Sequence, residues 1–444
     1  MAIVACYMRF IIEGIALFSH FLGAEMANIA VVDSNRLGIR MLERAKKLGH
    51  TVTFIRSATD NMYTLDDYVE QVFSTLDTVI TVRDSTSYPD VKQCLAQAHR
   101  TSPFDAIITV NEYALETAVS VARTLGVAST TPDAVFAARD KYQMRQILGR
   151  TGLSPIAFRL ADSVDEIIAA SAGMPYPLVV KPTRSCESLL AKVVYSAKEL
   201  ACAVSEIRSE YANLSVIMQG RISQRFILEE FITGPMFSAE FALANGVFYD
   251  FMISERIQAK HDATIELGNI MPSTLSQAVQ QQCFDYVHRV AQALGFETGV
   301  FHFEFILTQH GPVLVEANPR LMGGSMPYLY DFLTNQYIHD QVLNIHLQQP
   351  PEVANIPAGR FVVSLRLEAK QPGIISALPV LSDIRALSIK VLLFETYYQV
   401  GDRVSAGDII GRLNIDVSQP DNPREQVKTI WERCEAIVGI PLSI

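Results

Sequence analysis

The residues most suited to chemistry lie on either side of a turn at Gln309-His310-Gly311. Glu304 precedes the turn, and Glu316 and Asn318 follow it. Side chains alternate between the faces of a β-strand, so Glu304 shares a face with His302, and Glu316 shares one with Asn318. A tight hairpin can bring these faces together around one point. Carboxylate and amide oxygens are the ligands that Mg²⁺ prefers, so this spacing predicts a magnesium site.

The alternative for this segment is a surface hairpin whose acids are simply solvated. Its other residues are mostly Val, Leu, Phe and Ile, which favour a buried position. Two facing carboxylates without a cation would repel each other and would be costly to desolvate. The apolar surroundings therefore favour a bound cation.

The elements that position the hairpin begin with an alternating pattern of strands and helices. Strands are expected at 29–33, 51–56, 78–82 and 105–110, and helices at 37–48, 89–99 and 113–125. This order predicts a parallel sheet with helices on both faces. The first strand is followed by Ser34-Asn35-Arg36-Leu37-Gly38, which lacks the G-x-G-x-x-G pattern. Without those glycines the backbone cannot approach a pyrophosphate closely, so the sequence gives little support to a dinucleotide-binding oxidoreductase.

The pattern changes after Thr130. A helix is expected from Pro132 through Leu148, and a longer one over 276–294 that ends at Gly295. Hairpins are expected at 236–243 with 247–254 and at 300–307 with 313–317. After Pro350-Pro351, short strands and glycine-containing turns predict a β-rich segment.

These changes divide the chain into four parts. We expect an N-terminal extension at 1–25, an α/β domain at 26–130, a central domain at 131–350 with a lid at about 150–230, and a C-terminal β-rich domain at 351–444. The apolar run in the extension contains Glu13 and is too short to span a membrane. We therefore expect no stable membrane association, with a weak membrane or partner helix as the alternative.

Composition narrows the class of protein further. The 444 residues carry a net charge of −10, and this acidic balance argues against a nucleic-acid partner. The six cysteines form no CxxC pair, which is typical of reduced thiols in a cytosolic protein.

Glu304 followed by Glu316-x-Asn318-x-Arg320 resembles the metal-binding signature of ATP-grasp enzymes. The resemblance implies that the two acids and the asparagine hold Mg²⁺, or alternatively Mn²⁺, against the phosphates of ATP. It gives Arg320 the role of stabilising negative charge on the reacting groups. The implied fold is α/β, with α+β in the ATP-grasp part: an N-terminal parallel α/β domain, a central ATP-grasp domain and a small C-terminal β-rich domain.

Upstream motifs occur in the order expected of the same family. These motifs include Lys141 and Lys181. Either lysine alone would more often be a solvated surface charge, but the two together and in this order favour contacts with phosphate. The nucleotide contacts that the resemblance implies are Lys141, Lys181, Ser185, Ser188, Glu229, Glu230, Phe231, Ile232 and Glu240. Two departures stand out: the loop 183–188 contains no glycine, and Met236 occupies a position where many relatives have a ribose-binding glutamate.

Three further features resemble the L-amino acid ligase branch. They are the run from Glu266 to Pro272, the His302-x-Glu304 pair, and Gly323-Gly324-Ser325 after Arg320. The resemblance implies a cytoplasmic enzyme that activates an amino-acid carboxylate as an acyl phosphate and joins it to the amine of a second amino acid, releasing ADP and phosphate. A homodimer is common among such enzymes. The implied substrate contacts are Glu266, His302, Arg320, Gly323 and Gly324.

Several alternatives stay open. One is another ATP-grasp carboxylate–amine ligase, or a biotin-carboxylase-like enzyme, that uses a carboxylate other than an amino acid; a less favoured one is a non-catalytic nucleotide-binding module. The turns at 401–408 have a lipoyl-like rhythm but lack an attachment lysine. His302 is as well explained by strand packing as by substrate contact. For Arg256 and Lys260, contact with an anion is the less favoured interpretation.

Overall fold

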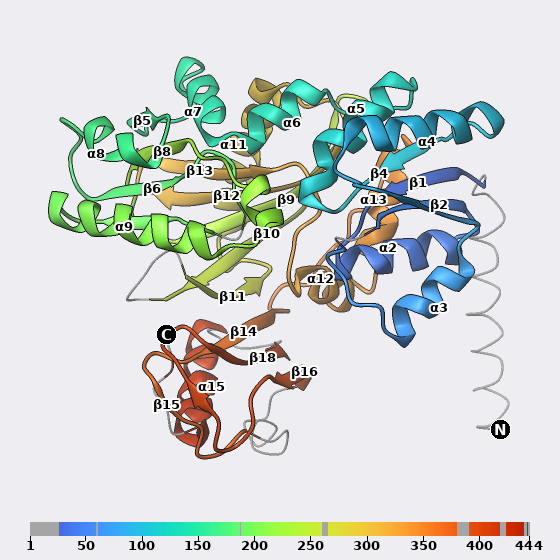
Figure 1. Ribbon diagram of the computed structural model, residues 1–444. Coiled ribbons are helices and arrows are strands. Elements are labelled where there is room, and N and C mark those ends of the chain that lie inside the picture. Colours follow the sequence, from blue (N-terminus) through green and yellow to red (C-terminus); the bar gives the residue numbers. More distant parts are fainter. Residues whose placement is uncertain are drawn as a thin grey trace, which may run out of the picture. The chain divides into compact units, whose positions relative to one another are not determined.

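The computed structural model drawn in Figure 1 describes residues 26–58, 61–186, 188–259, 265–379, 390–417, 423–438 and 442. The chain forms two compact units, one comprising Met1–Ser129 and His346–Gln349, the other Thr130–Ile345 and Pro350–Ile444. The expected extension at 1–25 and Lys260 lie outside the described residues.

The first unit contains a parallel sheet. Its strands lie in the order β3 (Thr78–Val82), β2 (Thr51–Ser57), β1 (Asn28–Val32) and β4 (Ala106–Ile108). Its helices are α2 (Arg36–Lys47), α3 (Asp67–Thr75), α4 (Tyr88–Thr101), the 3₁₀ turn η1 (Glu112–Ala114) and α5 (Leu115–Thr124). Ala30 and Val32 on β1 pack with residues of α4 and α5, while Phe54 on β2 contacts Phe73 on α3. The helices therefore cover both faces, as the sequence predicts (Figure 1).

The second unit is built on a large antiparallel sheet. Its strands lie in the order β13 (Gly311–Asn318), β12 (Gly299–Thr308), β9 (Met236–Ala244), β10 (Val247–Gln258), β11 (Glu266–Met271), β14 (Val362–Glu368), β18 (Ile409–Asp416) and β16 (Lys390–Thr396). The helix α11 (Gln277–Leu294) contacts β9, β10 and β13. It ends at Gly295, whose φ of 81° is the left-handed conformation that a glycine stop predicts.

A smaller antiparallel sheet in the same unit faces the β12–β13 hairpin. Its strands lie in the order β5 (Phe158–Ala161), β8 (Phe226–Glu230), β6 (Leu178–Pro182) and β7 (Lys192–Val194). The helices η2 (Val164–Glu166), α8 (Ile167–Ala170), α9 (Ala197–Asn213) and α10 (Val216–Arg221) accompany it. Leu178, Val180 and Leu228 pack with Leu200 and Ile207 of α9, so this sheet has a core of its own.

The C-terminal part is β-rich, as expected, but its strands β14, β18 and β16 continue the large sheet through the β11–β14 pair. A short ladder joins β15 (Gly373–Ile374) to β17 (Arg403–Val404). The sequence analysis did not anticipate α15 (Pro423–Val438), whose Trp431 is fully buried against this part of the sheet. Two further helices are α12 (Met326–Thr334) and α13 (Ile338–His346).

The prediction of one helix from Pro132 through Leu148 is wrong in one respect, because two separate helices meet at Asp140. The helix α6 (Pro132–Arg139) ends there, and α7 (Lys141–Arg150) begins. Asp140 has an extended ψ of 103°, and its side chain accepts hydrogen bonds from the backbone N–H groups of Tyr142 and Gln143. An aspartate at this position caps the new helix, and the break places Lys141 at its first turn.

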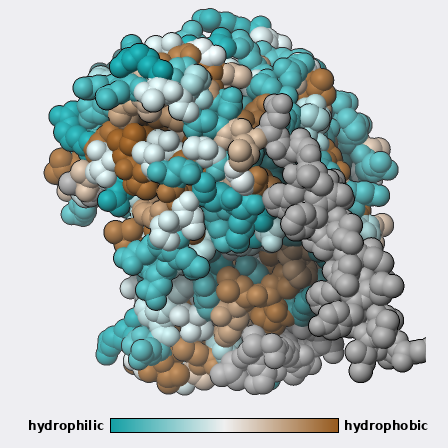
Figure 2. Space-filling view, turned by 90° about the vertical axis from the view of Figure 1, so that its right-hand side faces the viewer, coloured by the Kyte–Doolittle hydropathy of each residue, from teal (hydrophilic) through white to brown (hydrophobic). Residues whose placement is uncertain are grey.

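Figure 2 shows one face of the molecule, on which hydrophilic residues predominate and hydrophobic patches lie between them. In the described part of the chain, no helix combines the length and the apolar character needed to cross a bilayer. The five cysteines within the described ranges form no disulfide.

Candidate functional site

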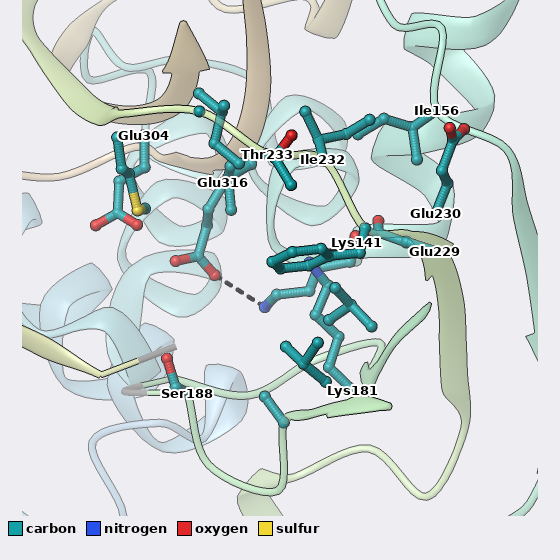
Figure 3. Close-up of a pocket in the computed structure, with 18 of the residues that line it drawn as sticks. Lys141, Ile156, Lys181, Ser188, Glu229, Glu230, Ile232, Thr233, Glu304 and Glu316 are labelled. Atoms are coloured by element: carbon teal, nitrogen blue, oxygen red, sulfur yellow. Dashed lines mark ion pairs between the residues drawn. The ribbon is translucent and has the colours of Figure 1, made fainter. Parts of the chain in front are cut away.

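A cavity of about 300 Å³ lies between the small sheet and the β12–β13 hairpin (Figure 3). Apolar side chains form much of its wall: Val179 and Val193 from the small sheet, Ile306 and Val315 from the hairpin, and Ile156 from the segment before β5. Eight of the nine expected nucleotide contacts also line it: Lys141, Lys181, Ser185, Ser188, Glu229, Glu230, Phe231 and Ile232. An apolar slot with a few charged groups at one end suits a flat ring attached to an anion.

Glu240 is the expected nucleotide contact that the structure places elsewhere. Its side chain is 2% exposed and does not line the cavity. It accepts a hydrogen bond from Ser238 Oγ at 2.8 Å and lies 2.8 Å from His302 Nδ1. Glu240 and His302 are direct partners across the β9–β12 ladder, which explains why the carboxylate meets the imidazole. Its contact with His302 makes it a positioning residue for that ring.

The register of the hairpin brings the predicted metal ligands together. Glu304 lies directly opposite Glu316, and His302 lies directly opposite Asn318. The ladder then shifts, so that Phe305 pairs with Leu314 and Val315 is left as an extra residue. This β-bulge breaks the alternation and allows Val315 and Glu316, although adjacent, both to line the cavity.

Each carboxylate of this pair is neutralised by a cation. Lys141 Nζ lies 2.8 Å from Glu316 Oε1, the contact drawn dashed in Figure 3. Arg256 forms an ion pair with Glu304. Burial raises the pKa of both carboxyls, but the groups around them together outweigh it, led by Lys141 at Glu316 and by Arg256 at Glu304, so both pKa values lie below their usual range. Both groups are therefore anionic at neutral pH.

This donor set fits a hard divalent cation. Among the described residues, no group of three or more His, Cys, Asp or Glu side chains forms a metal cluster. The site instead offers two opposed carboxylates and the Asn318 amide, whose Nδ2 donates to Glu316 Oε2 at 3.3 Å and leaves the amide oxygen as the ligand atom. All three are hard oxygen ligands, which suit Mg²⁺ or Mn²⁺.

A buried ion triad also lines this cavity. Glu229 Oε1 accepts from Arg145 Nε at 2.7 Å, and Glu229 Oε2 lies 2.8 Å from Lys181 Nζ. Burial raises the pKa of the Glu229 carboxyl, but Arg145 and Lys181 lower it more strongly, to about 2. Burial lowers the pKa of Lys181. Both oxygens of Glu229, an implied nucleotide contact, thus face cations.

Arg145 is not among the site residues that the sequence predicts. Its side chain is 1% exposed, and its Nη1 also donates to the Leu314 carbonyl on β13 at 2.7 Å, which connects α7 to the β12–β13 hairpin. A signal for it exists, because Arg145 follows Lys141 by four residues and therefore shares its helix face.

A second cavity, of about 630 Å³, adjoins the first. It contains all the expected substrate contacts: Glu266, His302, Arg320, Gly323 and Gly324. The two cavities share five lining residues: Ser188, Met236, Gln258, Glu304 and Glu316. The carboxylate pair therefore lies where the two cavities meet.

Arg256 organises one wall of the second cavity. Its side chain is 7% exposed, and its Nη1 lies 2.5 Å from Glu266 Oε2 while its Nη2 contacts Glu304. Burial lowers the pKa of Arg256, but Glu304 and Glu266 raise it more, so the guanidinium stays charged. Arg256 thus holds both acids in place, a role that the sequence analysis did not favour.

His302 completes this network. Its Nδ1 lies 2.8 Å from Glu240 Oε1, and its Nε2 lies 3.1 Å from Glu304 Oε1. Arg256 Nη2 also lies 2.9 Å from His302 Nε2, a contact that would suit a neutral ring. Burial lowers the pKa of His302, but Glu240 raises it to about 9, so the charged ring, with Nε2–H donating to Glu304, is the form at neutral pH.

We expect this histidine to make stability depend on pH. Its raised pKa means that the contribution is complete below pH 6.5 and disappears as the pH rises through about 9. The full contribution is about 3 kcal/mol. Urea unfolding of the wild type should therefore show a larger loss of stability between pH 6 and 9.5 than unfolding of His302→Gln. His310→Gln, on the exposed turn, should keep the wild-type difference; equal losses in all three proteins would contradict the assignment.

The glycine-free loop reaches its conformation in another way. Ser188 and Leu190 have φ values of 54° and 61°, in the left-handed region that glycine usually occupies. The backbone oxygen of Ser185 accepts a hydrogen bond from Lys141 Nζ at 3.2 Å. The loop therefore curves toward the cavity without glycine.

Comparisons with known proteins agree with this geometry. Residues 174–327 match the ATP-grasp domain family, and residues 42–127 match the ATP-grasp N-terminal domain family. The solved structure of L-amino acid ligase from Bacillus licheniformis has the same fold, with a TM-score of 0.71 and 20% identity over 93% of this chain and 98% of that one.

The curated relatives match this chain over a smaller part of its length. Dapdiamide A synthase from Enterobacter agglomerans is 25% identical over 67% of this chain and 70% of its own length. Alanine–anticapsin ligase from Bacillus amyloliquefaciens is 24% identical over 50% of this chain and 49% of its own length. The chain therefore spans only about half the length of some curated relatives that it matches.

Proposed function

Because the chain belongs to the ATP-grasp superfamily, we propose that it is an ATP-dependent carboxylate–amine ligase that joins two amino acids into a dipeptide. The observation that carries this proposal is the position of Glu304 and Glu316, which lie opposite each other where two cavities meet. A nucleotide in the first cavity would direct its phosphates toward the carboxylate pair. An acid in the second cavity would approach the same point from the other side.

The first step forms an acyl phosphate. A carboxylate oxygen of the first amino acid attacks the γ-phosphorus of ATP, and the bond from that phosphorus to ADP breaks. Lys141 and Lys181 line the nucleotide cavity and are placed to neutralise phosphate oxygens. Lys141 now pairs with Glu316, so it can exchange one anionic oxygen for another without crossing the cavity.

Glu304, Glu316 and Asn318 are the residues that would hold Mg²⁺. When bound there, the ion supplies positive charge to the phosphate oxygens. Arg256 and Lys141 keep the two acids ionised, so the ligands are ready for a cation. The lining of the first cavity is largely apolar, which limits access of water to the acyl phosphate.

The second step forms the new bond. The amine nitrogen of the second amino acid attacks the acyl carbon, the bond from that carbon to the phosphate oxygen breaks, and the departing phosphate takes up the proton that the amine loses. Arg320 lines the second cavity beside the turn formed by Gly323 and Gly324. Its guanidinium is placed to stabilise the negative oxygen of the tetrahedral intermediate, and His302 and Glu266 shape the amino-acid pocket.

Amino-acid substrates are supported by the relatives and by the cavity. The matched relatives include enzymes named as a dapdiamide synthase and an alanine–anticapsin ligase. The second cavity contains both acidic and basic side chains, which suit a molecule with an amine and a carboxylate.

The direct test is phosphate release from Mg²⁺-ATP across pairs of free amino acids, with mass detection of dipeptides. We expect ADP, phosphate and dipeptide in equal amounts for at least one pair. The absence of turnover with every pair would rule out the dipeptide ligase. Phosphate release with a single acid and ammonia would favour another carboxylate–amine ligase.

A further inference from the structure

Two arginines from the C-terminal strands line the second cavity. Arg366 on β14 and Arg412 on β18 lie directly opposite each other in the antiparallel ladder. Both side chains are half-buried, and both line the second cavity but not the first. They therefore face the substrate side of the site and not the nucleotide side.

Neither arginine forms an ion pair with any residue that the structure describes. Arg412 Nη1 donates to Ser325 Oγ at 3.4 Å, at the start of α12. Two acids are close in the strands: Glu368 follows Arg366 by two residues, and Glu395 lies opposite Arg412 on β16. Neither acid reaches ion-pair distance of the two guanidinium groups among the described contacts.

This arrangement is unfavourable unless something neutralises it. Like charges directly opposite each other in a ladder destabilise a sheet. In the same cavity, Glu266 and Glu304 form ion pairs with Arg256, so their negative charges are already neutralised. Among the described residues, no acid forms an ion pair with Arg366 or Arg412, so a bound anion would neutralise their charge. Two guanidinium forks suit the paired oxygens of a carboxylate or a phosphate.

The contact with Ser325 fixes where that anion would lie. Ser325 directly follows Gly323 and Gly324, which form the turn beside Arg320. The arginine pair therefore adjoins the region where the second step of the proposed ligation would occur. We propose that Arg366 and Arg412 bind an anionic oxygen group, carboxylate or phosphate, of the amine-bearing substrate, beyond its reacting nitrogen. The identity of that substrate as an amine rests on the proposed function.

The test compares matched amine substrates that differ only in charge. The pairs are glutamate and glutamine, aspartate and asparagine, and O-phosphoserine and serine, together with the α-carboxamide of glutamate. In Arg366→Met and Arg412→Met we expect KM for the charged member to rise roughly 10- to 100-fold, with kcat changed by less than about threefold. Arg366→Lys should give an intermediate rise, because it keeps the charge but loses the fork. Arg403→Met, on the exposed β17 outside both cavities, is the control and should match the wild type.

The pattern identifies the anion. A rise confined to glutamate and aspartate assigns a side-chain carboxylate, and a rise confined to O-phosphoserine assigns a phosphate. A similar rise for glutamate and glutamine that spares the α-carboxamide assigns the α-carboxylate. Unchanged KM values for every substrate in both variants would overturn the proposal.

Two further measurements separate this proposal from its premises. The melting temperatures of Arg366→Met and Arg412→Met should be unchanged or about 1–2 °C higher, because a repulsion is removed. Calorimetric titration of glutamate, O-phosphoserine and glutamine into the protein without ATP measures binding without turnover. Charge-dependent binding that both variants lose would support the anion site even if no dipeptide formed. Dipeptide formation with binding unaffected by either variant would refute the anion site and leave the ligase intact.

Discussion

Glu316→Gln should lower kcat for ATP-dependent ligation by at least about a thousandfold, which corresponds to roughly 4 kcal/mol of transition-state stabilisation. Glu316 faces Glu304 across the hairpin and lies in the wall shared by both cavities. The amide keeps the size of the side chain but removes the negative charge that a divalent cation requires. Steady-state phosphate release with saturating amino acids, measured across a range of Mg²⁺ concentrations, tests this expectation.

The fold of this variant should survive. The Glu316 side chain is 26% exposed, and a glutamine oxygen can still accept a hydrogen bond from Lys141. We therefore expect the thermal transition to move by only a few degrees. Glu206→Gln, on the exposed side of α9, is a matched control that should retain full activity. Full activity in Glu316→Gln would refute the metal assignment.

The sequence predicts the parts of this site that depend on local patterns. Strand alternation correctly places Glu304 on one face with His302, and Glu316 on one face with Asn318, but Glu304 lies opposite Glu316 only because of the bulge at Val315. The helix break at Asp140 also has a local signal in the sequence, because aspartate is a strong helix cap. The expectation of one continuous helix followed from apolar spacing, which the local hydrogen bonds of Asp140 override.

What the sequence does not reveal are partners that meet only in the folded chain. Arg145 and Glu229 are 84 residues apart, and Arg256 and Glu304 are 48 apart, so no spacing rule connects them. The bulge at Val315 is equally invisible, since one extra residue in a strand leaves the apolar pattern almost unchanged. Arg366 and Arg412 join the site only because β14 pairs with β11 and extends the large sheet.

Among the variants proposed for this protein, Glu229→Gln should lose the most free energy of unfolding. Glu229 is 3% exposed, and its two oxygens neutralise Arg145, which is 1% exposed, and Lys181. Removing one partner of a buried ion pair leaves an uncompensated charge and costs about 3–5 kcal/mol. The midpoint of urea unfolding at pH 7 should fall accordingly. Glu230→Gln is the matched control, because that neighbouring side chain lines the same cavity but accepts only a long bond of 3.4 Å from the Ala157 N–H.

Two measurements distinguish a charge effect from a packing effect at Glu229. The lowered pKa of about 2 means that the wild-type contribution is present above pH 4.5 and is lost as the pH falls through about 2, so the variant should approach the wild type in acid. Adding Arg145→Met to Glu229→Gln should cost less than the sum of the single changes, with a coupling of about 1–3 kcal/mol. Additive losses would show that the triad does not act as a unit. A coupled triad would mean that Glu229 supports the proposed catalysis from a distance, because it holds Lys181 in the first cavity and, through Arg145, connects α7 to the carbonyl of Leu314 on β13.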